Sequence, residues 1–382
     1  MEFVRWVGFV AGLLIVVATW GSTVRTLVVP RGQASRLGAF VARKLVRNAF
    51  QWTANRFDDY EVKDRILARS APMSLLAVLV AWLLMFLLGY GLMIWPFEDG
   101  TLASALRQAG SSMLTLGFES SSEPAVTAID FAAGATGLIV VALQIAYLPT
   151  LYGSFNRRET LVTMLQSRAG APAWGAELLA RTDLSNLESE LPFFYAEWER
   201  WAADVAETHS TYPVLVWFRS PHPLRSWIVG LVAVLDSAAL LNSLNPTTVP
   251  PQARLALRMG FTALRYIADV LRIPYDPDPF PDDPIELTYE EFLGGIHRMQ
   301  QAGHEIERTP EEAWQHFRGW RVNYEGIAYA IADLVTAPPG PWSGPRNHLP
   351  GMALVPQRPV DRRPDRPDHK QEPKASRFGW RP

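Results

Sequence analysis

Three long apolar runs lie in the first 155 residues of the chain, at about residues 4–24, 75–95 and 125–152. A helix needs about 20 predominantly apolar residues to cross the hydrocarbon core of a bilayer. Each run meets this requirement, with Arg5 at the edge of the first and Asp130 near the start of the third. The pattern therefore predicts an all-α protein with three membrane-spanning helices, in contact with the lipid bilayer.

The first run has two interpretations, a retained helix or a cleaved signal peptide. One basic residue, Arg5, precedes the run, and no small-x-small cleavage site follows it. A signal peptide would normally show a more basic start and such a site. These features favour a retained helix.

Basic residues predict the direction in which the helices cross. Short loops that carry Lys and Arg stay on the cytoplasmic side. The link between the second and third runs holds only one basic residue, Arg107. Ten basic residues lie between the first two runs: Arg25, Arg31, Arg36, Arg43, Lys44, Arg47, Arg56, Lys63, Arg65 and Arg69. We expect a multi-pass protein of the cell membrane, with the N-terminus and this link outside and everything after Arg157 in the cytoplasm.

Part of the basic loop, residues 37–50, has helical spacing of apolar side chains. Leu37, Phe40, Val41 and Leu45 would share one face of a helix. Such a helix either lies along the inner membrane surface or packs on a soluble domain. The spacing alone does not distinguish these two interpretations.

The link before the third run contains a short predicted helix, residues 101–113, followed by Thr115-Leu116-Gly117-Phe118-Glu119. This arrangement resembles the pore module of potassium channels, which carry Thr-x-x-Thr-x-Gly-(Tyr or Phe)-Gly between two membrane helices. Here the matching stretch is Ser-Met-Leu-Thr-Leu-Gly-Phe-Glu at residues 112–119. The resemblance covers about 80 residues, and Glu119 replaces the second glycine of the family.

The resemblance implies a homotetramer in which each chain supplies one re-entrant loop. Backbone carbonyl rings would replace the water shell of K⁺ or another monovalent cation, the permeant ion. The implied filter residues are Thr115, Leu116, Gly117, Phe118 and Glu119, and Ser112 would support them. Positions for lining or gating the pore are Gly134, Gly137 and Pro149. Asp130 should face protein or water rather than lipid, and it either hydrogen-bonds behind the filter as a second support or lies at headgroup level.

Glu119 is the main departure from the family pattern. A side chain in a left-handed backbone position costs roughly 1–2 kcal/mol, so we expect the outermost carbonyl ring to be disturbed. A ring of Glu119 side chains would also put negative charge at the pore mouth, as in cation pores. The sequence therefore predicts cation preference with weak discrimination between potassium and sodium.

The remainder of the chain predicts a helical cytoplasmic domain, at residues 157–337. Apolar stripes mark helices at about residues 187–206, 250–272, 289–306 and 310–335. In the second of these helices we expect Leu255, Met259, Thr262, Tyr266 and Val270 to form the buried face. Residues 227–244 are apolar enough for a fourth crossing, but their short length and Asp236 favour a buried soluble helix.

Other classes of function find little support in the sequence. The net charge of −2 gives no basic field for nucleic acid, and the chain has no cysteine. No Gly-rich nucleotide loop or catalytic constellation stands out, so we expect neither an enzyme nor a cofactor. His297 and His304 are too far apart for a typical zinc pair, and the acidic segment 276–283 is typical of a solvated linker.

The predicted organisation has five parts: an N-terminal helix (1–29), a basic loop (30–72), the pore module (73–156), the helical domain (157–337) and a Pro/Arg-rich disordered tail (338–382). Eleven of the 30 prolines lie in that tail. The alternative function is a non-conducting, membrane-anchored oligomeric sensor or scaffold whose helical domain binds a partner. The sequence does not identify such a partner.

The predicted topology can be tested with cysteines, because the chain has none of its own. Cysteines placed at Gly32 and at Ser121 should react with an impermeant reagent from opposite sides of the membrane, since the first lies in the basic loop. Labelling of both from outside intact cells would contradict the topology.

Overall fold

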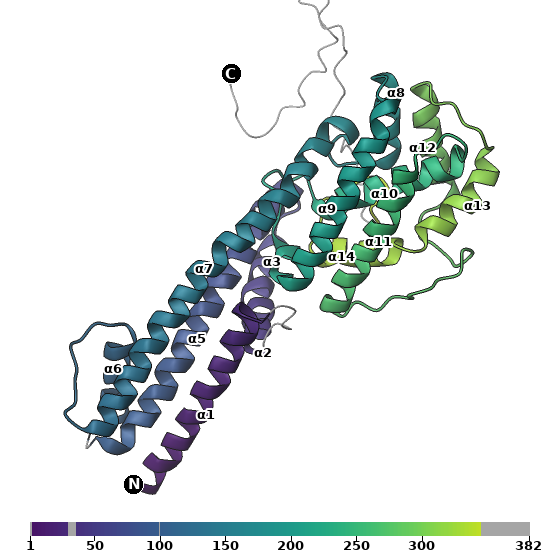
Figure 1. Cartoon of the computed structure of the whole chain (residues 1–382). Coiled ribbons are helices and arrows are strands. Elements are labelled where there is room, and N and C mark those ends of the chain that lie inside the picture. The colour runs from purple at the N-terminus through teal and green to yellow at the C-terminus, as the bar shows by residue number, and fades with distance from the viewer. Residues whose placement is uncertain (1, 30–35, 99, 345–382) are drawn as a thin grey trace, which may run out of the picture.

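The computed structural model describes residues 2–29, 36–98 and 100–344. Every regular element in these residues is helical, and the chain forms an elongated apolar bundle joined to a globular helical domain (Figure 1). Four helices are long and apolar enough to cross a membrane: α1 (Glu2–Leu27), the segment Tyr60–Phe97 that contains α5 (Ser70–Ile94), α7 (Pro124–Ala169) and α10 (Trp227–Leu244). The expected all-α class and a set of potential membrane helices are therefore confirmed.

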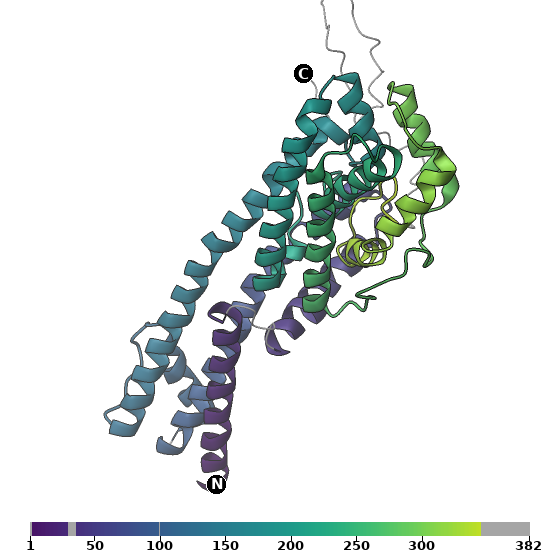
Figure 2. The same ribbon diagram turned by 45° about the vertical axis from the view of Figure 1, so that its right-hand side comes forward.

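In the apolar bundle, α1 packs along α5 (Figure 2), and two glycines lie where the helices meet. A β-carbon at Gly12 would lie 2.4 Å from the carbonyl oxygen of Gly89, so the two backbones approach too closely for any side chain there. Small residues at such crossings are common between membrane helices. The Trp82 indole N–H also donates to the hydroxyl of Ser22 at 2.8 Å. The first apolar run is thus an integral part of the bundle.

The basic loop folds into short helices between α1 and α5: α2 (Arg36–Phe40), a π-helix (Val41–Arg47), α3 (Asn48–Ala54) and α4 (Tyr60–Leu67). The π-helix packs against α5 and buries Val41, while Phe40 and Leu45 remain exposed. The predicted apolar face is therefore divided between protein contact and exposure.

Helix α7 continues without a break from the apolar bundle into the helical domain (Figure 1). Its 46 residues span roughly 70 Å at 1.5 Å per residue, far more than a bilayer core of about 30 Å. The predicted inner helix was expected to end at 152 and the domain to begin at 157. That boundary lies inside α7, because the helix carries the buried residues Val162 and Leu165 into the domain core.

Helix α10 forms the centre of the helical domain, and all of its residues are buried. It packs against α7, α8 (Gly175–Leu184), α11 (Pro251–Leu271), α13 (Pro310–Arg321) and α14 (Glu325–Leu334). Its apolar composition is accounted for by protein on every side. The structure thus agrees with the interpretation of residues 227–244 as a buried domain helix.

Two details of the predicted helices were wrong. In α11, Leu255, Tyr266 and Val270 of the expected stripe are exposed. The core face is formed instead by small and aliphatic residues, namely Ala253, Ala256, Leu257, Gly260, Ala263, Leu264, Ile267 and Ala268. Close packing against Leu235 requires Gly260, whose β-carbon would meet that side chain at 2.3 Å. The predicted helix 310–335 is two helices, which are separated by residues 322–324.

The remaining helices, α9 (Leu191–Thr211) and α12 (Tyr289–Gln301), begin close to the predicted positions. Thr288 and Thr309 form capping boxes with Glu291 and Glu312 at the starts of α12 and α13. Each threonine hydroxyl accepts a backbone N–H that the first helical turn leaves unpaired.

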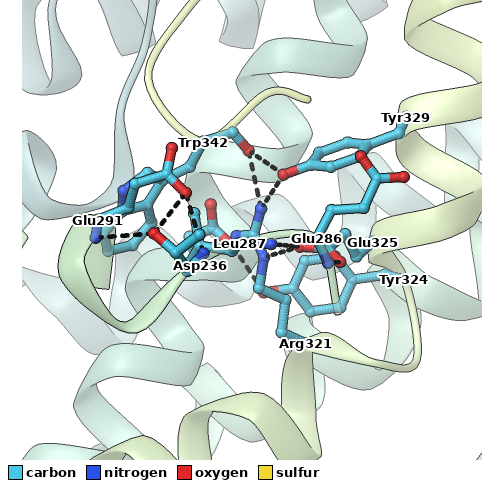
Figure 3. A network of polar contacts seen from close by, with 10 residues as sticks. Asp236, Glu286, Leu287, Glu291, Arg321, Tyr324, Glu325, Tyr329 and Trp342 are labelled. Carbon is cyan, nitrogen blue, oxygen red and sulfur yellow. Dashed lines mark hydrogen bonds and ion pairs between the residues drawn. The ribbon is translucent and has the colours of Figure 1, made fainter. Parts of the chain in front are cut away.

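A buried polar network ties the end of the domain together (Figure 3). The Arg321 guanidinium is fully buried and pairs with Asp236 of α10 and with Glu325. It also donates to the Trp342 carbonyl at 2.8 Å. A buried cation needs such partners because desolvation is costly.

This network corrects the predicted start of the tail. The Trp342 side chain is 3 % exposed and packs on Phe317. Residues 338–344 therefore belong to the domain, and the rest of the predicted tail lies outside the described residues.

One segment, η4 (Pro213–Trp217) with the two residues after it, joins the domain to both helices that flank the predicted pore loop. Arg158 of α7 is fully buried and donates to the carbonyls of Leu215 (2.8 Å) and Phe218 (2.6 Å). Arg219 pairs with Asp64 at 2.6 Å, and Asp64 lies in α4, the helix that directly precedes α5. Helix α7 and the helix that leads into α5 are thus both fixed to one short stretch of chain.

His209 completes this junction as a neutral acceptor. Its Nε2 lies 3.0 Å from the Arg158 guanidinium, which can only donate, so Nε2 accepts. Burial, and then the charge of Arg158, lower the pKa of His209 well below its usual value. The ring therefore stays uncharged beside the arginine.

Gly12→Ala should destabilise the folded protein by about 1–3 kcal/mol, because the new methyl group forces α1 away from the Gly89 carbonyl. Gly21→Ala is the matched control on the same helix, since a β-carbon there meets nothing within 4 Å. Thermal unfolding of the purified protein in one detergent would compare them. Equal midpoints for the two variants would contradict the close α1–α5 packing.

Candidate functional site

The predicted pore helix is α6 (Leu102–Met113), which lies at the end of the bundle farthest from the helical domain (Figure 1). It begins at Thr101, whose hydroxyl accepts the backbone N–H of Ser104. Helix α6 packs against α5 and α7, and the chain then turns through residues 114–123 before α7 starts at Pro124. The order expected of a re-entrant loop between two apolar helices is present.

One face of α6 holds the segment that follows it. The Ser111 hydroxyl accepts the backbone N–H groups of Phe118 and Glu119, both at 3.0 Å. The Ser111 carbonyl accepts the N–H groups of Leu116 at 2.8 Å and Gly117 at 3.4 Å. Four consecutive amides therefore find their acceptors on a single serine, which is fully buried.

The neighbouring face of α6 binds the inner helix. Asp130 of α7 accepts hydrogen bonds from Ser112 (2.7 Å) and from Gln108 (2.8 Å). Residues four apart lie on one face of a helix, so Gln108 and Ser112 reach the same carboxylate. The structure thus brings together the two predicted support residues, Ser112 and Asp130, and adds Gln108.

Two residues of the loop, Thr115 and Gly117, have a left-handed backbone conformation. Thr115 and Gly117 have φ values of 53° and 69°, in the left-handed region. The expected strain at Glu119 is absent, because Glu119 does not have a positive φ. Thr115 carries the cost instead, roughly 1–2 kcal/mol for a residue with a β-carbon. A row of carbonyl rings needs alternate residues in the left-handed conformation. Thr115 and Gly117 meet this requirement, and Glu119 does not.

Gly134 and Gly137 lie against the carboxyl end of α6. A β-carbon at Gly137 would lie 2.0 Å from the Met113 carbonyl oxygen, and one at Gly134 would lie 3.2 Å from that of Ser112. The two glycines let α7 approach α6 closely, a packing role that sequence reasoning did not assign. Pro149 lies within α7, which continues through it. Hinge and gate roles for these three residues stay predictions.

Sequence reasoning missed the partner of Glu119. The Arg107 Nε lies 3.0 Å from a Glu119 carboxylate oxygen, and the guanidinium lies 5.4 Å from the centre of the Phe118 ring. Arg107 precedes Ser111 by four residues, so both project from the same face of α6. That spacing was readable in the sequence, but the turn that brings Glu119 back to α6 was not.

The loop and part of α7 present apolar side chains that nothing in a single chain covers. Leu114, Leu116 and Phe118 are each more than half exposed. On α7 the three most exposed large apolar side chains recur every seven residues, at Phe131, Leu138 and Ile145. A seven-residue repeat is typical of a helix that packs on another helix with a left-handed crossing.

The other candidate residues have ordinary partners. His297 Nε2 lies 2.8 Å from Gln301, and His304 lies between Asp183 and Asn245. Among the described residues, no three His, Asp or Glu side chains gather as a metal site. In the acidic segment, Asp276 and Asp283 accept hydrogen bonds from nearby backbone N–H groups.

Comparison of the chain with protein-family models, with curated proteins and with solved structures found no match to any of them.

Ser111→Ala should increase hydrogen exchange at the amides of Phe118 and Glu119, because both lose their acceptor. A hydrogen bond contributes about 1 kcal/mol, so about a fivefold faster exchange is expected. Ser120→Ala is the control, since Ser120 is exposed on the same loop. Exchange measured by mass spectrometry on peptides that contain residues 116–120 would decide it. Unchanged exchange in Ser111→Ala would contradict the serine-held loop.

Proposed function

We propose that this protein is a membrane channel for monovalent cations, in which several copies of the chain, four by the family resemblance, surround one pore. The observation that carries the proposal is the loop after α6. Its left-handed residues Thr115 and Gly117 lie between two apolar helices, and Ser111 holds the segment on the pore helix. Non-helical backbone at membrane depth requires this kind of internal support.

Assembly of copies follows from what a single chain leaves uncovered. One loop supplies one set of carbonyls, and an ion needs a ring of them. Neighbouring copies would cover Leu114, Leu116 and Phe118, and the seven-residue repeat on α7 would face the axis or the adjacent copy. We therefore assign pore lining to Phe131, Leu138 and Ile145 in place of Gly134 and Gly137, which lie against α6.

Cation preference follows from the direction of α6. Its carboxyl end, at Met113, carries the negative end of the helix dipole and lies directly before the filter segment. Copies arranged around an axis would point these ends toward a common cavity. Discrimination between potassium and sodium requires several intact carbonyl rings. We expect it to be weak here, because the left-handed alternation stops before Glu119.

The proposed orientation puts the α5–α7 link outside the cell and the helical domain in the cytoplasm. The basic residues of α2–α4 and of the loop around them support this sidedness through the positive-inside rule. The junction at Arg158 and Arg219 would connect movements of the cytoplasmic domain to both pore helices.

Purified protein in mild detergent should have the mass of four chains, and after reconstitution it should conduct potassium and sodium but not chloride. Glu119→Gly should strengthen the potassium preference, because a glycine permits the left-handed conformation at that position. Native mass spectrometry and reversal potentials in liposomes would measure both.

Two outcomes would favour the alternative function, and a third would contradict only the argument about selectivity. A stable monomer, or a tetramer without cation flux under any tested condition, would favour the non-conducting anchor and scaffold. Strong potassium selectivity in the unmodified protein would contradict the argument from Glu119 while leaving the channel intact. Ser120→Gly is the control, since it adds a glycine to the same loop at an exposed position beside Glu119.

A further inference from the structure

The pore helix carries a positive charge directly opposite the acidic residue of the filter segment. The Arg107 Nε lies 3.0 Å from a Glu119 carboxylate oxygen. Arg107 is the only basic residue between α5 and the end of α7's predicted membrane span. The acidic ring expected from the sequence is therefore accompanied by an equal number of positive charges.

We propose that Arg107 determines the cation concentration at the outer mouth of the pore by neutralising Glu119. This inference rests on the proposed channel function. Each copy contributes one positive charge at Arg107 and one negative charge at Glu119, so these two residues together add no net charge to the mouth for any number of copies. The sequence-based expectation of an attractive acidic ring changes accordingly, because cations near the mouth meet a ring of ion pairs.

The Arg107–Glu119 ion pair affects the electrostatic field at the pore mouth more than it stabilises the fold. The side chains of Arg107 and Glu119 are 66 % and 38 % exposed. Ion pairs this exposed contribute little to stability, at most about 1 kcal/mol. The backbone beside them is held independently by Ser111. Removing Arg107 should therefore leave the loop in place and expose the full negative charge of Glu119.

A second contact must be separated from this electrostatic role. The Arg107 guanidinium lies 5.4 Å from the centre of the Phe118 ring, a cation–π distance. Lysine at position 107 keeps the positive charge and loses the planar guanidinium. Arg107→Lys should therefore behave like the unmodified protein if charge matters, and like Arg107→Gln if the stacking geometry matters.

The test measures single-channel conductance of potassium in lipid bilayers at about 10 mM and about 1 M salt. Screening extends over about 30 Å in the first condition and about 3 Å in the second. At low salt Arg107→Gln should conduct about two- to fivefold more than the unmodified protein, and Glu119→Gln correspondingly less. The double variant Arg107→Gln/Glu119→Gln should return to the unmodified value, because positions 107 and 119 again add no net charge. At high salt all four proteins should agree closely.

The outcomes distinguish the two proposals. Conductance of Arg107→Gln at or below the unmodified value at low salt would overturn the role of Arg107, as would a double variant that resembles Glu119→Gln. If Arg107→Lys has the same low-salt conductance as Arg107→Gln, the charge of Arg107 is not what matters. Arg107 would then act by positioning Phe118. Absence of conductance in the unmodified tetramer would overturn the channel itself, and with it this inference.

Discussion

The apolar bundle depends on one constraint, that backbone amides outside a helix must find acceptors within the protein where water is scarce. Helix α6 meets it with two adjacent faces. Ser111 takes the amides of residues 116–119, and Ser112 with Gln108 binds the carboxylate of Asp130. Because the same helix holds both the loop and α7, the loop has a fixed position relative to the inner helix. Asp130, an expensive residue within an apolar helix, is stabilised by the same contacts.

Helix α7 connects the loop end of the bundle to the helical domain and is fixed to both. Asp130 fixes its first turns to α6, and Arg158, about eight turns later, fixes it to the carbonyls of Leu215 and Phe218. A buried guanidinium without these acceptors would be strongly unfavourable, so α7 has little freedom to slide or rotate within the domain. Arg219 binds Asp64 in the segment that leads into α5. Bundle and domain are therefore joined at two helices.

The sequence predicted elements better than it predicted faces. Apolar length identified α1, α5, α7 and α10, and apolar periodicity located the starts of α12 and α13. The buried face of each helix was harder to predict, because the burial of small residues such as Gly12, Gly137 and Gly260 depends on the partner helix. The stripe of larger residues on α11 misled for this reason. At the loop, Ser112 was identified from the family resemblance, and Asp130 from its charge within an apolar run. Ser111, Gln108 and Arg107 became visible only once the turn returned residues 116–119 to α6.

Glu119 illustrates how a local substitution is accommodated by the surrounding side chains. A glycine in the second position of the family motif would tolerate a left-handed backbone there. This chain avoids that conformation at Glu119, and its loop is held instead by hydrogen bonds to Ser111. The left-handed cost appears four residues earlier in the loop, at Thr115, where the amide donates to the Ser112 carbonyl at 3.1 Å. A segment whose amides bind a serine of the preceding helix, α6, is less dependent on glycine.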